Sequence, residues 1–119
     1  MLSKKVNWYK VADSIMAIDW QNNNMAVVEA GDKKITLVKL ENEIAACSGK
    51  CPHAGGEMAH GFVDALGNIV CPLHRYKFSL RNGYNVSGEG YYLKVYKVEH
   101  REEGVFVGLE ESSWPNSFR

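Results

Sequence analysis

The chain has 119 residues, and its 14 Lys and Arg balance its 14 Asp and Glu, so the formal net charge is zero. Hydrophobic residues make up 45% of the sequence and charged residues 24%, which suits one globular domain with a modest core. A chain without a basic excess is not expected to bind nucleic acid, and no stretch approaches the roughly 20 apolar residues of a membrane helix.

No apolar run follows Lys4 and Lys5 near the amino terminus, so the sequence predicts a cytoplasmic protein without an export signal. The chain contains three cysteines. An odd number of cysteines in a reducing compartment favours metal or redox chemistry over disulfide bonds. The cysteines are therefore the first candidates for a functional site.

Short segments of alternating apolar and polar residues predict β-strands along most of the chain. After an irregular segment over Asp13–Asn24, Met25–Ala30 and Lys34–Leu40 flank Gly31-Asp32-Lys33 and read as a hairpin. Arg81-Asn82-Gly83-Tyr84 contains Asn-Gly, a strong hairpin signal. Further strands are expected over Ile44–Cys47, Asn68–Val70, Tyr91–Val98 and Val105–Leu109.

Many short strands joined by close turns predict an all-β fold, an antiparallel β-sandwich or small barrel. We expect one domain over residues 1–111 and a polar tail over 112–119. A β-domain of this size needs aromatic core residues, and Trp8, Tyr9 and Trp20 are assigned to that role. Because side chains alternate along a strand, the rings of Tyr91 and Tyr92 should point to opposite faces.

Two cysteine–histidine pairs carry the strongest chemical signal: Cys51-Pro52-His53 and Cys71-Pro72-Leu73-His74. Each pair follows the end of a predicted strand, and the proline after each cysteine restricts the backbone beside it. Two such loops can each present a thiolate and an imidazole to one metal centre. Two sulfur and two nitrogen ligands suit either tetrahedral zinc or an iron–sulfur cluster with mixed ligands.

The order of the ligands disfavours zinc. Structural zinc sites usually open with two cysteines and close with two histidines, whereas each half of this site carries one of each. A two-iron centre suits the pattern, because one iron can bind both thiolates and the other both imidazoles.

These residues resemble the Rieske family, whose pattern is Cys-x-His, a gap of about 15 to 17 residues, and then Cys-x-x-His. The likeness extends to Met58, Gly61, Phe78 and Gly83 and covers roughly residues 8–109. It implies a Rieske-type antiparallel fold with a cluster-binding subdomain formed by two loops. It also implies one [2Fe–2S] cluster with four ligands: Cys51, His53, Cys71 and His74.

The resemblance also implies a reduction potential. Two thiolates leave the oxidised centre electrically neutral, whereas four would make it an anion, so the potential exceeds that of plant-type ferredoxins. High-potential members add a disulfide, at positions occupied here by Gly56 and Leu73, and hydroxyl donors, at positions that look like Tyr76 and Phe78. Fewer donors predict the low end of the range, roughly −150 mV. Ser87-Gly88-Glu89-Gly90 stands where many members have a proline-bearing loop over the cluster.

By this resemblance the protein is a soluble electron carrier and not an enzyme. It would take electrons from a flavin reductase, pass them to an oxygenase through His53 and His74, and work as a monomer. Three alternatives stay open: a small subunit of a nitrite reductase-type complex, a redox or iron sensor, and a zinc-binding interaction module. Cys47 is interpreted as a small buried hydrophobe and His60 as an exposed loop residue, since four ligands already complete the cluster.

Overall fold

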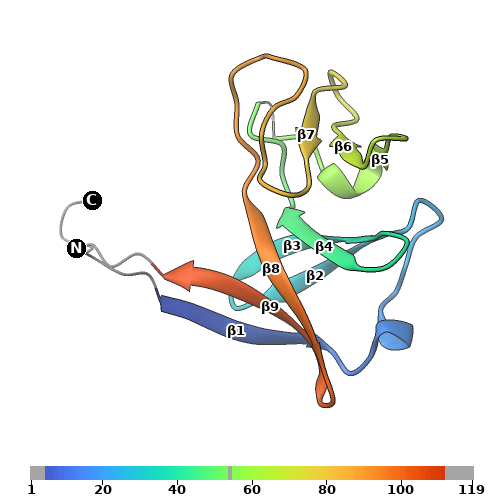
Figure 1. The fold of residues 1–119 in the computed structure, drawn as a ribbon, viewed down its shortest axis with the longest axis vertical. Coiled ribbons are helices and arrows are strands. Elements are labelled where there is room, and N and C mark those ends of the chain that lie inside the picture. The colour runs from blue at the N-terminus through green and yellow to red at the C-terminus, as the bar shows by residue number, and fades with distance from the viewer. Residues whose placement is uncertain (1–4, 54, 112–119) are drawn as a thin grey trace.

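The computed structural model describes residues 5–53 and 55–111 (Figure 1). Over these residues the larger of two antiparallel sheets has the strand order β1-β9-β8-β4-β3-β2. Its strands in chain order are β1 (Lys5–Ala12), β2 (Met25–Ala30), β3 (Lys33–Lys39), β4 (Ile44–Ser48), β8 (Val95–Arg101) and β9 (Gly104–Glu111).

The smaller sheet has the order β5-β6-β7 and lies at one end of the molecule, away from the β8–β9 turn (Figure 1). Its strands are β5 (Phe62–Val63), β6 (Asn68–Val70) and β7 (Lys77–Ser79). Two short 3₁₀ helices, η1 (Ile15–Ala17) and η2 (Met58–His60), complete the elements of the described residues. The all-β class expected from the sequence is confirmed.

The larger sheet curls so that β2 and β3 pack against β9. Ile35 and Leu37 of β3 meet Val105 and Val107 of β9 in a first core, and all four side chains are fully buried. Burial of each such side chain contributes about 1.5–3 kcal/mol. The alternation of residues along β3 therefore supplies one wall of this core.

A second core joins the two sheets and lies on the opposite face of β3 and β4. Val38 and Cys47 enter it from the larger sheet, and Ile69 and Phe78 enter it from the smaller one. Since neighbouring residues of a strand point to opposite faces, β3 and β4 contribute to both cores. Strand β3 is consequently buried on both sides over Ile35–Val38.

The strand expected over Tyr91–Val98 is partly wrong. Strand β8 begins only at Val95 and continues to Arg101, because the preceding residues form a loop held by a buried asparagine. Tyr91 and Tyr92 lie in that loop and are 37% and 69% exposed, so they do not alternate between inside and outside.

Strand β1 was not foreseen, and it changes the roles of the aromatic residues near the amino terminus. Tyr9 and Trp20 pack against the first core as expected. The ring of Trp8 instead lies beneath the guanidinium of Arg101, with 5.2 Å between the guanidinium carbon and the ring centroid.

The predicted tail over 112–119 lies outside the described residues. Within the described part of the chain, no helix is long and apolar enough to cross a membrane.

Candidate metal centre

The first candidate ligand loop starts at Cys51 and is closed by its own backbone. The N–H of Cys51 donates to the carbonyl of Gly56 at 2.8 Å, and the N–H of Gly55 donates to the carbonyl of Cys51 at 2.9 Å. Gly55 has a φ of +72°, a left-handed conformation that glycine adopts without strain. A β-bridge between Lys50 and Glu57 closes the base of the loop.

The second loop repeats this backbone design. The N–H of Cys71 donates to the carbonyl of Tyr76 at 2.9 Å, and the N–H of Arg75 donates to the carbonyl of Cys71 at 3.0 Å. Arg75 has a φ of +60° at the position that corresponds to Gly55, and pairing of Val70 with Lys77 closes the base. The two cysteines therefore occupy equivalent positions in two matching loops.

The two loops place both candidate thiols in one core on the inside and both candidate imidazoles beside each other on the outside. Cys51 and Cys71 are only 3% and 1% exposed and belong to the second core beside Phe78. His53 is half-buried and His74 is exposed, and their Nδ1 atoms lie 3.3 Å apart. The site thus presents the two candidate nitrogen ligands toward solvent and shields the two candidate sulfur ligands with apolar side chains.

Gly56 allows the loops to approach each other closely. A Cβ atom at this position would lie 2.9 Å from Cδ1 of Leu73 and 3.4 Å from Sγ of Cys71. The two positions at which the resemblance places a disulfide in high-potential proteins are therefore in contact, but neither residue is a cysteine.

Two tyrosines pack around His53. The ring of Tyr76 stacks on the His53 imidazole with 4.4 Å between centroids, and the Tyr91 ring lies 5.2 Å away. Partial desolvation and then the charge of Glu89 raise the pKa of the Tyr76 phenol above its usual value. Tyr76 lies beside the outer imidazole, and Phe78 supplies an apolar ring to the cysteine side of the site.

Side-chain amides far away in the sequence hold η2, the short helix that follows the first loop. Gln21 donates to the carbonyl of Ala59 at 2.8 Å, and Asn23 donates to the carbonyls of Ala59 and Gly61 at 2.9 and 3.0 Å. A Cβ atom on Gly61 would stand 2.0 Å from the carbonyl oxygen of Val70. No local signal marks the two amides, but the close backbone approach explains the glycine.

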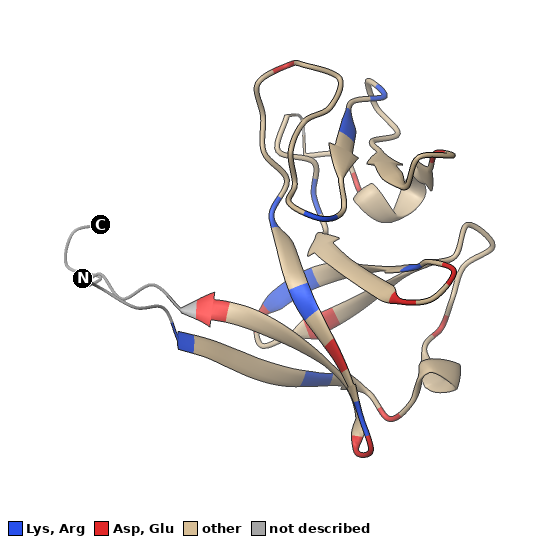
Figure 2. Ribbon diagram, viewed as in Figure 1, with Lys and Arg blue, Asp and Glu red and all other residues tan. Residues whose placement is uncertain are grey.

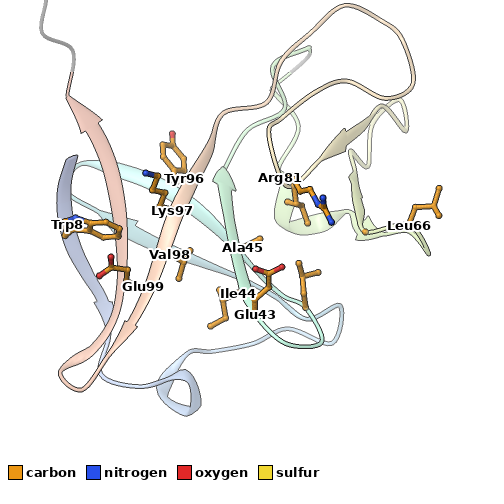
Figure 3. A pocket seen from close by; sticks show the side chains of 13 residues that line it. Trp8, Glu43, Ile44, Ala45, Leu66, Arg81, Tyr96, Lys97, Val98 and Glu99 are labelled. Carbon is orange, nitrogen blue, oxygen red and sulfur yellow. The ribbon is translucent and has the colours of Figure 1, made fainter. Parts of the chain in front are cut away.

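The other residues considered from the sequence do not join the site. Cys47 is fully buried in the second core as expected, and burial raises the pKa of its thiol to about 12. His60 is exposed at the end of η2. A groove of about 690 Å³ runs along β8 between Trp8, Ile44, Arg81 and Leu66, and none of the four predicted ligands lines it (Figure 3).

The chemistry of the donor set fits a cluster of two irons with mixed ligands. Two buried thiols can supply anionic sulfur in an apolar environment, and two outer imidazoles can supply neutral nitrogen. The three cysteines of the chain are thiols and not disulfides. Within the described residues, no three His, Cys, Asp or Glu side chains are close enough to share a single metal ion.

Comparison with known families gives the class of the protein. The model of the Rieske [2Fe-2S] domain matches residues 7–97. The chain therefore belongs to the Rieske [2Fe-2S] domain family, whose members bind one [2Fe–2S] cluster through two cysteines and two histidines.

Individual relatives are components of oxygenase systems. The chain is 26% identical over 92 residues to the ferredoxin component of the alkene monooxygenase system of Xanthobacter autotrophicus, which covers 77% of this chain and 75% of the relative. It is 31% identical over 77 residues to the ferredoxin component of the naphthalene 1,2-dioxygenase/salicylate 5-hydroxylase systems of Ralstonia sp., covering 65% of this chain and 70% of the relative.

Solved structures agree in fold. A chain from the complex of reduced oxygenase and oxidised ferredoxin in carbazole 1,9a-dioxygenase matches with a TM-score of 0.69 and 26% identity, over 84% of this chain and 91% of the other. A putative nitrite reductase small subunit matches with a TM-score of 0.70 and 22% identity, over 85% and 97%. The second likeness is one of fold alone.

Proposed function

We propose that this protein is a Rieske-type ferredoxin that carries single electrons, with Cys51, His53, Cys71 and His74 as the ligands of its cluster. The observation that supports the assignment is the arrangement of these four side chains on two matching loops. The thiols are buried, and the imidazoles face outward with their Nδ1 atoms 3.3 Å apart.

The residues of the chain have separate tasks in this proposal. When bound, the cluster supplies a one-electron redox couple. Cys51 and Cys71 hold it from the apolar side, where Phe78 and the second core exclude water. His53 and His74 hold it from the outer side and give a partner protein a short path for the electron. Since all four ligands come from the protein, no coordination position is left for substrate chemistry, and we propose a carrier without enzymatic activity of its own.

The relatives support an oxygenase system as the setting of the proposed partners. Ferredoxin components of alkene monooxygenase and naphthalene dioxygenase systems are the relatives reported above, so we propose an oxygenase as acceptor and a flavin reductase as donor. We propose that the protein acts as a monomer in the cytoplasm, a reducing compartment that suits cysteines without disulfide bonds. The likeness to a nitrite reductase small subunit extends to the fold only and does not favour that alternative.

The test begins with the cofactor. The protein is purified anaerobically, reconstituted if necessary, and assayed for iron, labile sulfide and zinc, and the reduced form is examined by electron paramagnetic resonance. We expect two irons, two sulfides and a rhombic signal. Cys71→Ser should lose the cluster, whereas Cys47→Ser, a substitution of another buried thiol, should keep it. A protein with one zinc and no iron would refute the proposal.

The second half of the test is electron transfer. The loaded protein is reduced chemically and mixed with an oxidised oxygenase component from the same organism, and both absorbance spectra are followed. Re-oxidation of the ferredoxin with matching reduction of the oxygenase is the expected result. The loaded protein could instead exchange electrons with a nitrite reductase and not with the oxygenase component. That result would favour the alternative, a small subunit of a nitrite reductase-type complex.

A further inference from the structure

The loop between β7 and β8 is built around the side chain of Asn85. This side chain is 3% exposed, and its Oδ1 accepts hydrogen bonds from the backbone N–H groups of Glu89 at 2.8 Å and Tyr91 at 3.3 Å. Its Nδ2 lies 3.0 Å from the carbonyl oxygen of Lys77 and 3.1 Å from Oγ of Ser87. One buried amide thereby ties the middle of the loop, up to Tyr91, to strand β7.

The same amide and a serine hydroxyl hold the carboxylate of Glu89. Ser87 Oγ donates to Oε1 of Glu89 at 2.5 Å, and Nδ2 of Asn85 donates to the same oxygen at 2.9 Å. Ser87 Oγ also accepts from the N–H of Lys77 at 2.9 Å. The hydrogen bond from Ser87, and then that from Asn85, keep the pKa of Glu89 below its usual value, so the carboxylate stays charged at neutral pH.

The loop that carries this carboxylate reaches the histidine side of the candidate centre through Tyr91. The loop that leads into β8 carries one acidic segment (Figure 2). The Tyr91 ring, two residues further along, lies 5.2 Å from the His53 ring. Lys77, to which the loop is tied, follows Tyr76, whose ring stacks on His53. The Glu89 charge accordingly interacts with both His53 and Tyr76.

We propose that Asn85 and Ser87 are positioning residues that hold the Glu89 carboxylate beside His53, and that the charge of Glu89 lowers the reduction potential of the centre. This inference rests on the proposed function, since it takes His53 as a cluster ligand. Reduction adds a negative charge to the centre, and a fixed carboxylate nearby makes that addition less favourable. Because Glu89 is exposed, dissolved salt screens part of the effect.

The test compares two substitutions that remove the same charge at different places. Glu89→Gln keeps the shape of the side chain and its Oε1 acceptor. The control, Glu103→Gln, changes an exposed residue at the β8–β9 turn, at the opposite end of the molecule from β5, β6 and β7 (Figure 1). For both variants and the parent protein, the midpoint potential is measured at pH 7 in low and high salt, together with iron content and the electron paramagnetic resonance spectrum.

We expect Glu89→Gln to shift the midpoint potential upward, with a smaller shift in high salt, while Glu103→Gln stays at the parent value. Ser87→Ala removes one of the two hydrogen bonds to the carboxylate and should shift the potential in the same direction by a smaller amount. If Glu89→Gln does not retain the cluster, the midpoint potential of Ser87→Ala tests the role of Glu89 instead.

Two failures are distinguishable. If the parent protein holds no cluster, the proposed function itself is wrong. If the parent and the variants hold the same cluster, but Glu89→Gln and Ser87→Ala have the potential of Glu103→Gln, only the role of Glu89 is refuted.

Discussion

The Nδ1 atoms of His53 and His74 lie 3.3 Å apart, although 21 positions separate the two residues in the sequence. Their rings meet edge to face, with 4.8 Å between centroids and an interplanar angle of 66°. Two loops with the same backbone hydrogen bonds bring them together on the outer side of the buried cysteines. Because the two rings lie together, both histidines are proposed as ligands, and a substitution of each can test that role.

Replacing either outer histidine by cysteine should lower the reduction potential. His53→Cys or His74→Cys exchanges a neutral ligand for an anionic one, which moves the centre toward the roughly −400 mV of plant-type ferredoxins. The measurement is a redox titration followed by circular dichroism. His60→Cys, at an exposed position on η2, serves as the control and should leave the potential unchanged. An intact cluster with the parent potential in both ligand variants would contradict the ligand assignment.

The glycines of the β5–β6 hairpin should respond very differently to alanine. In Gly61→Ala the new Cβ would stand 2.0 Å from the carbonyl oxygen of Val70, and this overlap with backbone should cost roughly 3 kcal/mol of unfolding free energy. In Gly67→Ala no atom lies within 4 Å, and only the φ of +84° opposes the substitution, at about 1 kcal/mol. Urea denaturation of both variants checks the difference, and equal losses would refute the close approach.

The thiol of Cys47 should make the protein less stable at alkaline pH. Burial raises its pKa from 9.0 to about 12, so between these values the folded state keeps a proton that the unfolded state releases. Stability from this group is complete below pH 9 and declines as the pH rises. At pH 10 the loss is about 1.4 kcal/mol relative to pH 7. Urea titrations at several pH values measure how the free energy of unfolding depends on pH, and Cys47→Ala should remove the decline above pH 9. Equal declines in the parent protein and the variant would contradict this role of Cys47.

Asp64 should contribute to stability above its pKa and lose that contribution in acid. Burial alone would raise its pKa, but N–H donors from Asn68 and Leu66 and the charge of Lys77 bring it below 3.8. Since the folded state binds the proton more weakly, the contribution is present above about pH 4 and fades as the pH falls. Asp64→Asn should cost about 1 kcal/mol at pH 7 and show a flatter acid limb in thermal melts between pH 7 and pH 3. A cost that is equally large at pH 3 would argue against the ionised carboxylate as its source.

Local patterns in the sequence predict most of the strands and turns of the fold. The hairpin around Gly31 is confirmed within one residue, with β3 starting at Lys33, because alternation and a turn residue coincide there. Asn68–Val70 forms a strand with the predicted bounds. The structure places Cys51 and Cys71 in one core and His53 beside His74, on two loops with matching backbone hydrogen bonds. The assignment of these four residues to iron remains a prediction until a ligand variant is measured.

Other features depend on contacts between distant residues and leave no local trace. Tyr91 and Tyr92 read as strand residues by composition, but the buried side chain of Asn85 binds the backbone of Glu89 and Tyr91 and holds the segment in a loop. Trp8 reads as a core residue, yet Gly108 of the neighbouring strand leaves room for its ring on the outer face of the sheet. To predict the environment of such residues, one must know which strands and loops lie beside them in the folded chain.

The backbone hydrogen bonds within the two ligand loops bear on how the cofactor is acquired. Each cysteine accepts and donates a bond inside its own loop, at 2.8–3.0 Å, so the peptide framework is organised by the chain itself. A loop whose backbone is already held by its own hydrogen bonds loses less conformational entropy when it binds a ligand than a loop without such bonds. These bonds should therefore strengthen the retention of the proposed cluster without supplying any ligand to it.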